Sequence, residues 1–407
     1  MIELVLAALV CAVPTVRWYL ETKEHRDRVD SLKVRVHVNG IRGKSSVSRL
    51  VAGVLRAGGY TPIGKTTGSA AVVIDRDGRD QPIQRSGPPT ILEQLEIVDE
   101  WVTDDVDALV IECMAINPNY QRVCERQIVR SDIGCLTNVR EDHQDQMGET
   151  LPEIARSLLN TCPLNGVLIT SEHDPELLEI IGEEVAGRNS RLIVTNPETV
   201  TRADMAGFGY IEFEENVSIG LEVAKQLDIP RHIAMAGMWS AEPDPGVLRI
   251  ENARVGHVDV TWANMFAVND RESTMFVMDR VLSFARPDTV TVGILNNRLD
   301  RQQRALQFAD IAARDLDLDI LVTFGAYERV VSDRLVAAGF PRTRILNLGD
   351  ERNVSWDQIV KEMILDRGTN HVLLAGLVNI HTHQAEQLME FFANAETSEV
   401  FLTERAA

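Results

Sequence analysis

A short glycine-rich segment carries most of the chemical information in this chain. Residues 38–46 read VNGIRGKSS. They follow an alternating run, residues 34–38, which predicts a buried first strand. They precede residues 47–55, where apolar side chains recur at helical spacing. Glycines in a strand-to-helix turn let backbone N–H groups crowd an anion at the positive end of the helix, so the segment predicts a phosphate-binding loop.

The side chains of this loop fit a nucleotide with its metal ion. Lys44 can reach the outer phosphates, and the Ser45 hydroxyl can bind Mg²⁺. A Walker A loop would need a glycine at Val38, whereas this chain has the shorter pattern G-x-x-G-K-S starting at Gly40. The alternative, an ordinary turn with a chance lysine, leaves the strand–loop–helix context unexplained. The loop residues expected to contact nucleotide are Gly40, Arg42, Gly43, Lys44, Ser45 and Ser46.

The composition limits the class of protein. The 407 residues suffice for two or three domains, and 44% of them are hydrophobic, enough to build cores. The formal net charge of −20, without a basic stripe, argues against a nucleic-acid partner. The five cysteines form no C-x-x-C pair, which disfavours a disulfide framework or zinc site and favours a reducing compartment.

The N-terminus has a different character from the rest of the chain. Residues 4–16 are free of charge until Arg17, and aromatic and then basic residues follow. A signal peptide would carry its positive charge before the apolar run. We therefore expect residues 1–32 to form an uncleaved anchor in the cell membrane, with the catalytic part on the cytoplasmic side. Because the run is shorter than the roughly 20 residues of a membrane span, a helix packed on the body or on a partner is the alternative.

From residue 33 onward, strand-like apolar runs alternate with amphipathic stretches, which predicts an α/β fold with parallel-type sheets. In such sheets the ligand site lies beyond the carboxyl ends of the strands. Residues 241–246 (AEPDPG) predict a joint between an ATP-binding domain, 33–240, and a smaller doubly wound domain, 241–407. The expected strands are 107–111, 133–137, 166–170, 191–194, 289–295, 320–324, 344–347 and 371–375.

Three further polar segments fall at the ends of predicted elements. Glu112 directly follows the strand 107–111, where it can be a Mg²⁺ ligand or a solvated loop acid, and the sequence leaves both open. Residues 137–145 (TNVREDHQD) hold several side chains that bind metals or nucleotides. Residues 64–69 (GKTTGS) can form a second phosphate contact, a substrate loop or a plain turn.

The ordered set of motifs resembles the central domain of the Mur ligase superfamily, which includes the peptidoglycan amino-acid ligases and folylpolyglutamate synthetase. That domain has G-x-x-G-K-[ST], then a strand-end glutamate, then T-N-x-x-x-D-H-x-D, and all three are present here in order. The resemblance implies a Mur ligase-like P-loop ATPase domain followed by a smaller Rossmann-like domain. It implies that Lys44 binds the phosphates of ATP. It also implies that Glu112 and His143, with Ser45, hold Mg²⁺, or Mn²⁺ as the alternative.

The same resemblance assigns roles outside the loop. Asn138 and Asn216 are expected to contact the nucleotide, Asn216 from a helix near the adenine. Arg249, after the joint, corresponds to an arginine that reaches across the domains. Asp270 lies in residues 269–274 (NDREST), which look like the loop that closes on ATP and substrate. The expected catalytic set is Lys44, Glu112, His143, Arg249 and Asp270.

Two features of this chain differ from those of the peptidoglycan ligases in the Mur ligase superfamily. Many Mur ligases carry a carbamylated lysine near the position of Leu158, and this chain has no lysine there, so a second metal must be held differently or more weakly. Only residues 1–39 precede the loop, which leaves no room for a UDP-sugar-binding domain. The apolar N-terminus and the ordered motifs resemble the ligase subunits of poly-γ-glutamate synthases over nearly the whole chain. Those motifs are VNGIRGKSS, GKTTG, ECMAINPNYQ, EDHQDQMG, PDPG, NDRES and GLVNIH.

This closer resemblance implies a reaction and partners. ATP phosphorylates the γ-carboxylate at the end of a poly-γ-glutamate chain, and the amino group of an incoming glutamate attacks the acyl phosphate, for capsule or secreted polymer. Closure of the C-terminal domain would exclude water. Small membrane subunits and further copies of the chain are the expected protein partners. Candidates for holding substrate carboxylates are Arg42, Arg140, Arg271 and Arg301.

Two rival functions remain at this stage. One is a ligase for another acceptor, such as a folate, although a folate enzyme would not need an N-terminal anchor. The other is a nucleotide-gated regulatory or scaffolding subunit of a membrane complex. Glu112 and the Asp142-His143 pair favour catalysis over switching, whereas the missing lysine argues modestly the other way.

Overall fold

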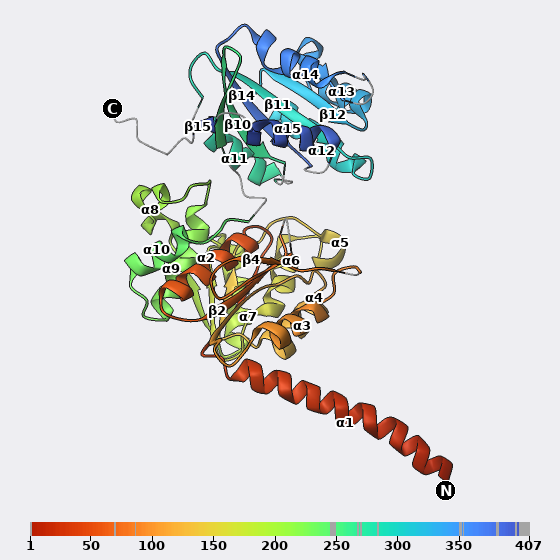
Figure 1. Ribbon diagram of the computed structural model, residues 1–407, viewed down its shortest axis with the longest axis vertical. Helices are drawn as coiled ribbons and strands as arrows, with labels where there is room; N and C mark the ends of the chain where they lie inside the picture. Colours follow the sequence, from red (N-terminus) through yellow and green to blue (C-terminus); the bar gives the residue numbers. More distant parts are fainter. Residues whose placement is uncertain are drawn as a thin grey trace. The chain divides into compact units, whose positions relative to one another are not determined.

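Two sheets, each packed against helices, organise the part of the chain that the computed structural model describes (Figure 1). This part is residues 2–398 without 69–70, 86, 245–249, 267, 269–270, 283–284, 350–351, 353, 380–381 and 395–396. The chain divides into two compact units. Unit 1 comprises Met1–Phe208 and Glu212–Pro245, and unit 2 comprises Gly209–Ile211 and Gly246–Ala407. Strand and helix alternate in both units, which confirms the predicted α/β class.

The sheet of unit 1 has eight strands in the order β4-β3-β2-β5-β1-β6-β7-β8. From β2 to β8 every neighbouring pair is parallel, whereas β3 and β4 add an antiparallel edge. Val38 of β1 is in register with Glu112 of β5 on one side and Cys135 of β6 on the other. The loops after these three strands therefore leave the sheet side by side. The strands are β1 (Val34–Asn39), β2 (Pro62–Thr66), β3 (Val72–Ile74), β4 (Asp80–Pro82), β5 (Ala108–Glu112), β6 (Ile133–Leu136), β7 (Val167–Thr170) and β8 (Arg191–Val194).

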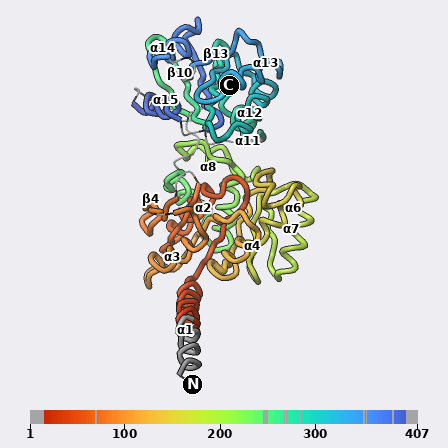
Figure 2. The backbone as a smooth tube through the Cα atoms, turned by 90° about the vertical axis from the view of Figure 1, so that its right-hand side faces the viewer, coloured from red at the N-terminus to blue at the C-terminus, as the bar shows by residue number. Residues whose placement is uncertain are grey.

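Helices cover both faces of this sheet. On one face α2 and α9 pack on apolar side chains of β1, β5 and β6. The other face is covered by α3 and the π-helix η1 at one end, and by α6 and α7, which lie side by side, at the other (Figure 2). These helices are α2 (Lys44–Ala57), α3 (Leu92–Trp101), η1 (Cys124–Val129), α6 (Leu151–Leu158), α7 (Pro175–Gly187) and α9 (Glu214–Gln226). The others are α1 (Ile2–Asp30), α4 (Pro118–Val123), α5 (Gln144–Met147), η2 (Leu159–Thr161), η3 (Pro197–Thr199), α8 (Arg202–Ala206) and α10 (Arg231–Trp239).

The predicted N-terminal membrane anchor was wrong. Residues 2–30 form one helix, α1, but among the described residues no helix has a stretch long and apolar enough to cross a membrane. The physical reason is the short apolar run, which ends at Arg17 and is followed by a strongly charged half. That second half contacts the rest of unit 1, where His25 Nε2 lies 3.0 Å from the carbonyl of Ile128 and Arg28 pairs with Asp99 at 3.1 Å.

The sheet of unit 2 has the order β13-β12-β11-β14-β10-β9-β15, with antiparallel pairing only at β9 among its described pairs. One face packs against α14 and α15, and Trp262 of β10 stacks on Phe392 of α15 with ring centroids 5.1 Å apart. The strands are β9 (Ile250–Val255), β10 (Val258–Met265), β11 (Val290–Asn297), β12 (Ile320–Gly325), β13 (Ile345–Asn347), β14 (His371–Leu377) and β15 (Thr397–Ser398). The helices are α11 (Arg271–Leu282), α12 (Gln302–Arg314), α13 (Glu328–Ala337), η4 (Arg342–Arg344), α14 (Trp356–Met363), η5 (Leu365–Arg367) and α15 (His383–Asn394).

Candidate active site

The predicted phosphate loop connects β1 to α2 and packs tightly against its neighbours. Gly40 has φ +132° and Gly43 has φ +79°, conformations that residues with a side chain rarely adopt. A Cβ atom on Gly40 would lie 2.0 Å from Thr137 Oγ1, and one on Gly43 would lie 2.7 Å from Asn216 Oδ1. Glycine at these two positions is therefore required by both the backbone angle and the space.

The segment after β6 braces this loop. Thr137 Oγ1 donates a hydrogen bond to the Arg42 carbonyl at 2.6 Å, and Asn138 Nδ2 donates to the same oxygen at 3.2 Å. In return, the Arg42 N–H donates to Asn138 Oδ1 at 3.1 Å. Asn138, a predicted nucleotide contact, thus holds the backbone of the loop that follows β1. This arrangement results from β6 being the neighbour of β1 in the sheet.

Lys44 places a cation over the loop. Its Nζ donates to the carbonyl of Gly40 at 2.8 Å and to that of Ile41 at 3.1 Å. Burial lowers the pKa of Lys44, while the nearby Glu112 carboxylate acts in the opposite direction. Ser46 lies beside it in the first turn of α2 and is half-buried.

Ser45 and Glu112 form a close pair of oxygen ligands. Ser45 Oγ donates to Glu112 Oε2 at 2.8 Å, and the Thr67 N–H donates to the same oxygen at 2.7 Å. Gln94 Nε2 donates to the Glu112 carbonyl at 3.2 Å, and Glu112 is only 2% exposed. A Cβ atom on Gly68 would lie 2.4 Å from Ser45 Oγ. Residues 64–68, the described part of the segment 64–69 whose role the sequence left open, therefore border this pair. The two oxygen types match the preference of Mg²⁺.

His143 lies in the segment after β6, next to an ion pair with the loop. Asp142 Oδ2 lies 3.2 Å from Arg42 Nη2, and Asp142 Oδ1 accepts a hydrogen bond from the His143 N–H at 2.9 Å. His143 has φ +48°, precedes α5, and its side chain is 46% exposed. In the described part of the chain no group of three or more His, Cys, Asp or Glu could hold a metal ion. The metal set of Ser45, Glu112 and His143 therefore stays a prediction.

The remaining predicted residues divide into one that the structure places and two that it does not describe. Asn216 lies on α9 against Gly43, is 5% exposed, and donates from Nδ2 to Glu212 Oε1 at 2.7 Å. Arg249 and Asp270 lie outside the described residues. The contact between Asn216 and adenine remains a prediction.

Sequence reasoning missed Glu172, which follows β7. Its Oε2 accepts from the Val139 N–H at 3.0 Å, and its Oε1 accepts from the His173 N–H at 2.9 Å and the Asp174 N–H at 3.1 Å. Glu172 is 4% exposed, so these bonds fix the backbone at Val139, within the segment that carries His143. The available signal was its position after an apolar strand, which is the signal that revealed Glu112.

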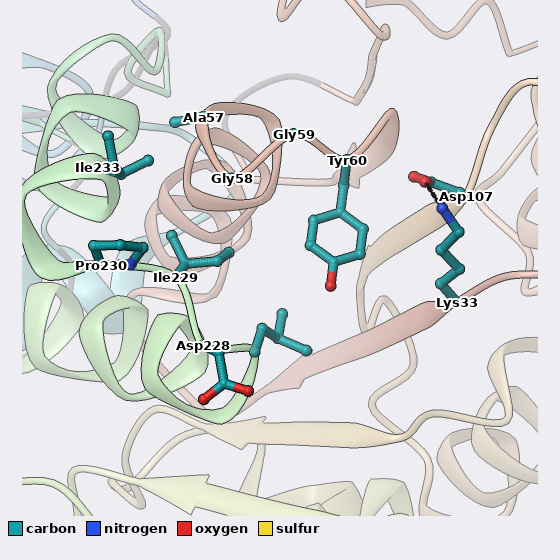
Figure 3. Close-up of a pocket in the computed structure, with 11 residues that line it drawn as sticks. Lys33, Ala57, Gly58, Gly59, Tyr60, Asp107, Asp228, Ile229, Pro230 and Ile233 are labelled. Atoms are coloured by element: carbon teal, nitrogen blue, oxygen red, sulfur yellow. Dashed lines mark hydrogen bonds and ion pairs between the residues drawn. The ribbon is translucent and has the colours of Figure 1, made fainter.

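A hollow of about 410 Å³ lies elsewhere in unit 1 (Figure 3). Lys33 and Asp107, which form an ion pair at 3.0 Å, line it together with Tyr60 and Ile229. These two charged residues precede β1 and β5, whereas the phosphate loop and Glu112 come at the ends of the same strands. The hollow therefore lies at the amino-terminal ends of these strands, opposite the phosphate loop, and none of the predicted site residues lines it.

Comparison with known proteins identifies the family. Residues 38–242 match the Mur ligase middle domain, and residues 250–395 match the poly-gamma-glutamate synthase CapB C-terminal domain. The chain is 37% identical over 391 residues to PGA synthase CapB of Bacillus subtilis (strain 168), which covers 95% of this chain and 96% of that protein. The chain belongs to the CapB family. This confirms the resemblance inferred from the motifs and places the chain among the ATP-dependent amide ligases.

Two further comparisons bear on the family and on the fold. The capsule biosynthesis protein CapB of Bacillus anthracis is 34% identical over 351 residues, covering 86% of this chain and 75% of that protein. The bifunctional folylpolyglutamate synthase/dihydrofolate synthase of Yersinia pestis, solved with AMPPNP and a Mn ion, matches 92% of this chain and 93% of that one. Its TM-score is 0.63 at 14% identity, so it shows that this CapB family chain shares that fold.

Proposed function

We propose that this chain uses ATP to activate the γ-carboxylate at the end of a glutamate chain and joins it to the amino group of another glutamate. The product is poly-γ-glutamate, for a capsule or for release. The observation that carries this proposal is the Ser45–Glu112 pair, 2.8 Å apart, at the N-terminus of α2 beside Lys44. A hydroxyl and a carboxylate next to a phosphate loop form a donor set that fits Mg²⁺ and a triphosphate.

The residues of unit 1 divide the work of phosphoryl transfer. The N–H groups at the start of α2 and the Lys44 ammonium attract the phosphates and stabilise the charge that moves during transfer. Ser45, Glu112 and His143 would hold Mg²⁺, or Mn²⁺, which when bound neutralises charge on the phosphate oxygens. Asn138 keeps the loop in shape, and Asn216, which borders Gly43, is proposed to contact the nucleotide base.

The proposed reaction has two steps. A γ-carboxylate oxygen of the acceptor attacks the γ-phosphorus of ATP, the bond to ADP breaks, and an acyl phosphate forms. The glutamate nitrogen then attacks the acyl carbon, loses a proton, and phosphate leaves with the electrons of the carbon–oxygen bond. Holding two anionic reactants together is a large part of the task, and positively charged side chains serve it.

Arginines are the candidates for binding substrate carboxylates. Arg42 pairs with Asp142 at 3.2 Å, Arg140 lies 3.7 Å from Glu172, and Arg271 pairs with Asp315 at 2.7 Å. A substrate carboxylate would have to share or replace these partners. We propose Arg42 and Arg140 as the candidates within unit 1, because both lie beside the phosphate loop and the segment that carries His143. The candidates in unit 2 are Arg271 and Arg301. For Arg249 and Asp270 we propose the other catalytic roles that the family resemblance implies, Arg249 as an arginine that reaches across the domains and Asp270 in the loop that closes on ATP and substrate.

The proposal also includes assembly. We propose that further subunits of the synthase and further copies of this chain accompany it in the cell, because the CapB relatives are named for a synthase and for capsule biosynthesis. Copurification from the native source, followed by identification of the bound proteins, tests this part. Recovery of the chain alone and as a monomer would contradict it.

The test of the reaction is ADP and phosphate release from Mg²⁺-ATP with and without glutamate or short γ-glutamyl peptides, with hydroxylamine added to trap acyl phosphate. We expect glutamate-dependent turnover and a hydroxamate product, both lost with EDTA and restored by Mg²⁺. Nucleotide binding without turnover would support a regulatory subunit instead. Turnover that requires a folate acceptor would support the other ligase.

Variants connect the reaction to the site. Lys44→Ala should lower turnover by about 10²–10³-fold, the usual effect of removing one preorganised electrostatic contact. Lys225→Ala is the matched control, because this lysine side chain is 75% exposed on α9. His143→Ala should raise the Mg²⁺ concentration needed for half-maximal turnover. Full turnover by Lys44→Ala would show that the phosphate assignment is wrong, and an unchanged Mg²⁺ requirement in His143→Ala would show that the metal assignment is wrong.

A further inference from the structure

A buried pair of amide side chains lies below the phosphate loop. Asn39 is the last residue of β1, directly before Gly40, and is 2% exposed. Its Nδ2 donates to Gln121 Oε1 at 2.9 Å and also approaches the Leu158 carbonyl and Thr161 Oγ1, each at 3.1 Å. Gln121 on α4 is completely buried. Buried polar atoms whose hydrogen-bonding needs are met in this way keep the nearby backbone in one arrangement.

Gln121 extends the network to the segment that follows Glu112. Its Nε2 donates to the carbonyl of Ile116 at 2.8 Å and lies 3.4 Å from Ser157 Oγ. The segment from Glu112 to Gln121 is thus fixed at both ends, by β5 pairing at one end and by the amide pair at the other. Sequence reasoning used this segment, ECMAINPNYQ, only to recognise the family and gave Gln121 no role.

The third partner is the end of α6 with η2. Ser157, Leu158 and Thr161 supply acceptors to the amide pair, and Thr161 Oγ1 donates to the Leu158 carbonyl at 2.9 Å. Along the chain, α6 follows α5 and the segment that carries His143. The amide pair therefore joins the end of β1, directly before the phosphate loop, to the segment that follows Glu112 and to the end of α6 with η2.

We propose that Asn39 and Gln121 are positioning residues, which set the phosphate loop relative to the segment bearing Glu112 and to the end of α6. This inference rests on the proposed function, because it assumes that the loop binds Mg²⁺-ATP. The chemistry requires an amide at position 121: the Asn39 N–H group needs an acceptor, and the Ile116 carbonyl needs a donor. An ionised carboxylate can supply the first but not the second, and an aliphatic side chain supplies neither.

The discriminating change is Gln121→Glu, which preserves size but places an oxygen against the Ile116 carbonyl. Gln121→Met is the second variant, similar in volume and without charge, and serves if the first does not fold. Thr195→Val is the matched control, because the Thr195 hydroxyl makes a buried hydrogen bond to Ser218 Oγ at 2.8 Å away from the amide pair. For each protein we would measure thermal unfolding and the affinity for Mg²⁺-AMPPNP by calorimetry, at a temperature where all are folded.

We expect Gln121→Glu to weaken Mg²⁺-AMPPNP binding by about tenfold, the effect of one disrupted buried hydrogen bond, while Thr195→Val loses stability only. The double-mutant cycle of Asn39→Ala and Gln121→Ala should show non-additive losses of affinity, since the two side chains act together. Variants that lose stability yet bind Mg²⁺-AMPPNP within twofold of the wild type would overturn the positioning role. A wild-type protein that binds no Mg²⁺-AMPPNP would instead overturn the proposed function on which it rests.

Discussion

Gly40→Ala is the perturbation whose effect can best be worked from the structure. Gly40 has φ +132°, and an added Cβ would lie 2.0 Å from Thr137 Oγ1. Gly59 also has positive φ, +88°, but an added Cβ meets nothing within 4 Å. Gly59→Ala therefore measures the backbone strain, about 1–3 kcal/mol, in the same unit and away from the loop. The difference in stability between the two variants therefore reports the cost of the close packing around Gly40 in the phosphate loop.

The extra cost of Gly40→Ala has two parts. Forcing apart packed atoms costs about 1–3 kcal/mol, and displacing Thr137 weakens its 2.6 Å hydrogen bond to the Arg42 carbonyl, which adds about 0.5–1.5 kcal/mol. We expect Gly40→Ala to be less stable than Gly59→Ala by about 1.5–4.5 kcal/mol.

Urea unfolding followed by tryptophan fluorescence measures this difference in stability. Calorimetry measures the affinity of each variant for Mg²⁺-AMPPNP, which reports whether the phosphate loop still binds nucleotide. Binding should be lost in Gly40→Ala and kept in Gly59→Ala. Equal stability of the two variants, with wild-type affinity in Gly40→Ala, would refute the reasoning.

Two other predictions concern buried charges. Lys65, completely buried, pairs with Glu93 at 3.1 Å, so Lys65→Met should lower the free energy of unfolding by about 3 kcal/mol, measured in urea; an unchanged midpoint would contradict this. Burial acts to lower the pKa of His37, but the Cys113 thiol and the Glu125 carboxylate raise it to about 9. Stability from this pair should be complete below pH about 6.5 and lost as pH rises through 9, by about 3 kcal/mol in total. His37→Gln should remove that pH dependence, and an identical pH profile in the variant would exclude the imidazole as its source.

Local patterns predicted the elements that the site needs. The expected strand 107–111 is β5 (Ala108–Glu112), and the expected helix 47–55 lies within α2 (Lys44–Ala57). Both succeed because the buried side chains recur with the period of the element, and the buried face of α2 includes Val47, Leu50 and Val51. The order of the three motifs along the chain then sufficed to recognise the family. In the structure these motifs follow parallel strands that are neighbours in the sheet, which brings them together.

Contacts between distant segments could not be predicted in the same way. Thr67 holds Glu112 through its backbone N–H, a bond that any residue type except proline could form at that position. Gln121 and Glu172 act through buried hydrogen bonds to segments 33 or more residues away. Glu172 follows an apolar strand, as Glu112 does, but the local pattern does not show which distant segment either residue contacts. The prediction of an N-terminal membrane anchor failed for a different reason. The apolar run at the N-terminus is too short to cross a membrane, so its local hydrophobicity alone did not justify a membrane span.

The two hydrogen bonds of Lys44 have a consequence for which anions the loop can capture. Its ammonium has three N–H donors, and two of them are directed at the Gly40 and Ile41 carbonyls, at 2.8 and 3.1 Å. A phosphate therefore meets the third lysine donor directly and gains a second only by displacing a carbonyl, which limits the net free energy of this contact. A single free phosphate gains little from one such hydrogen bond. A triphosphate that also engages the helix N-terminus and the oxygen pair gains from several contacts at once, so the loop selects for the length of the phosphate chain.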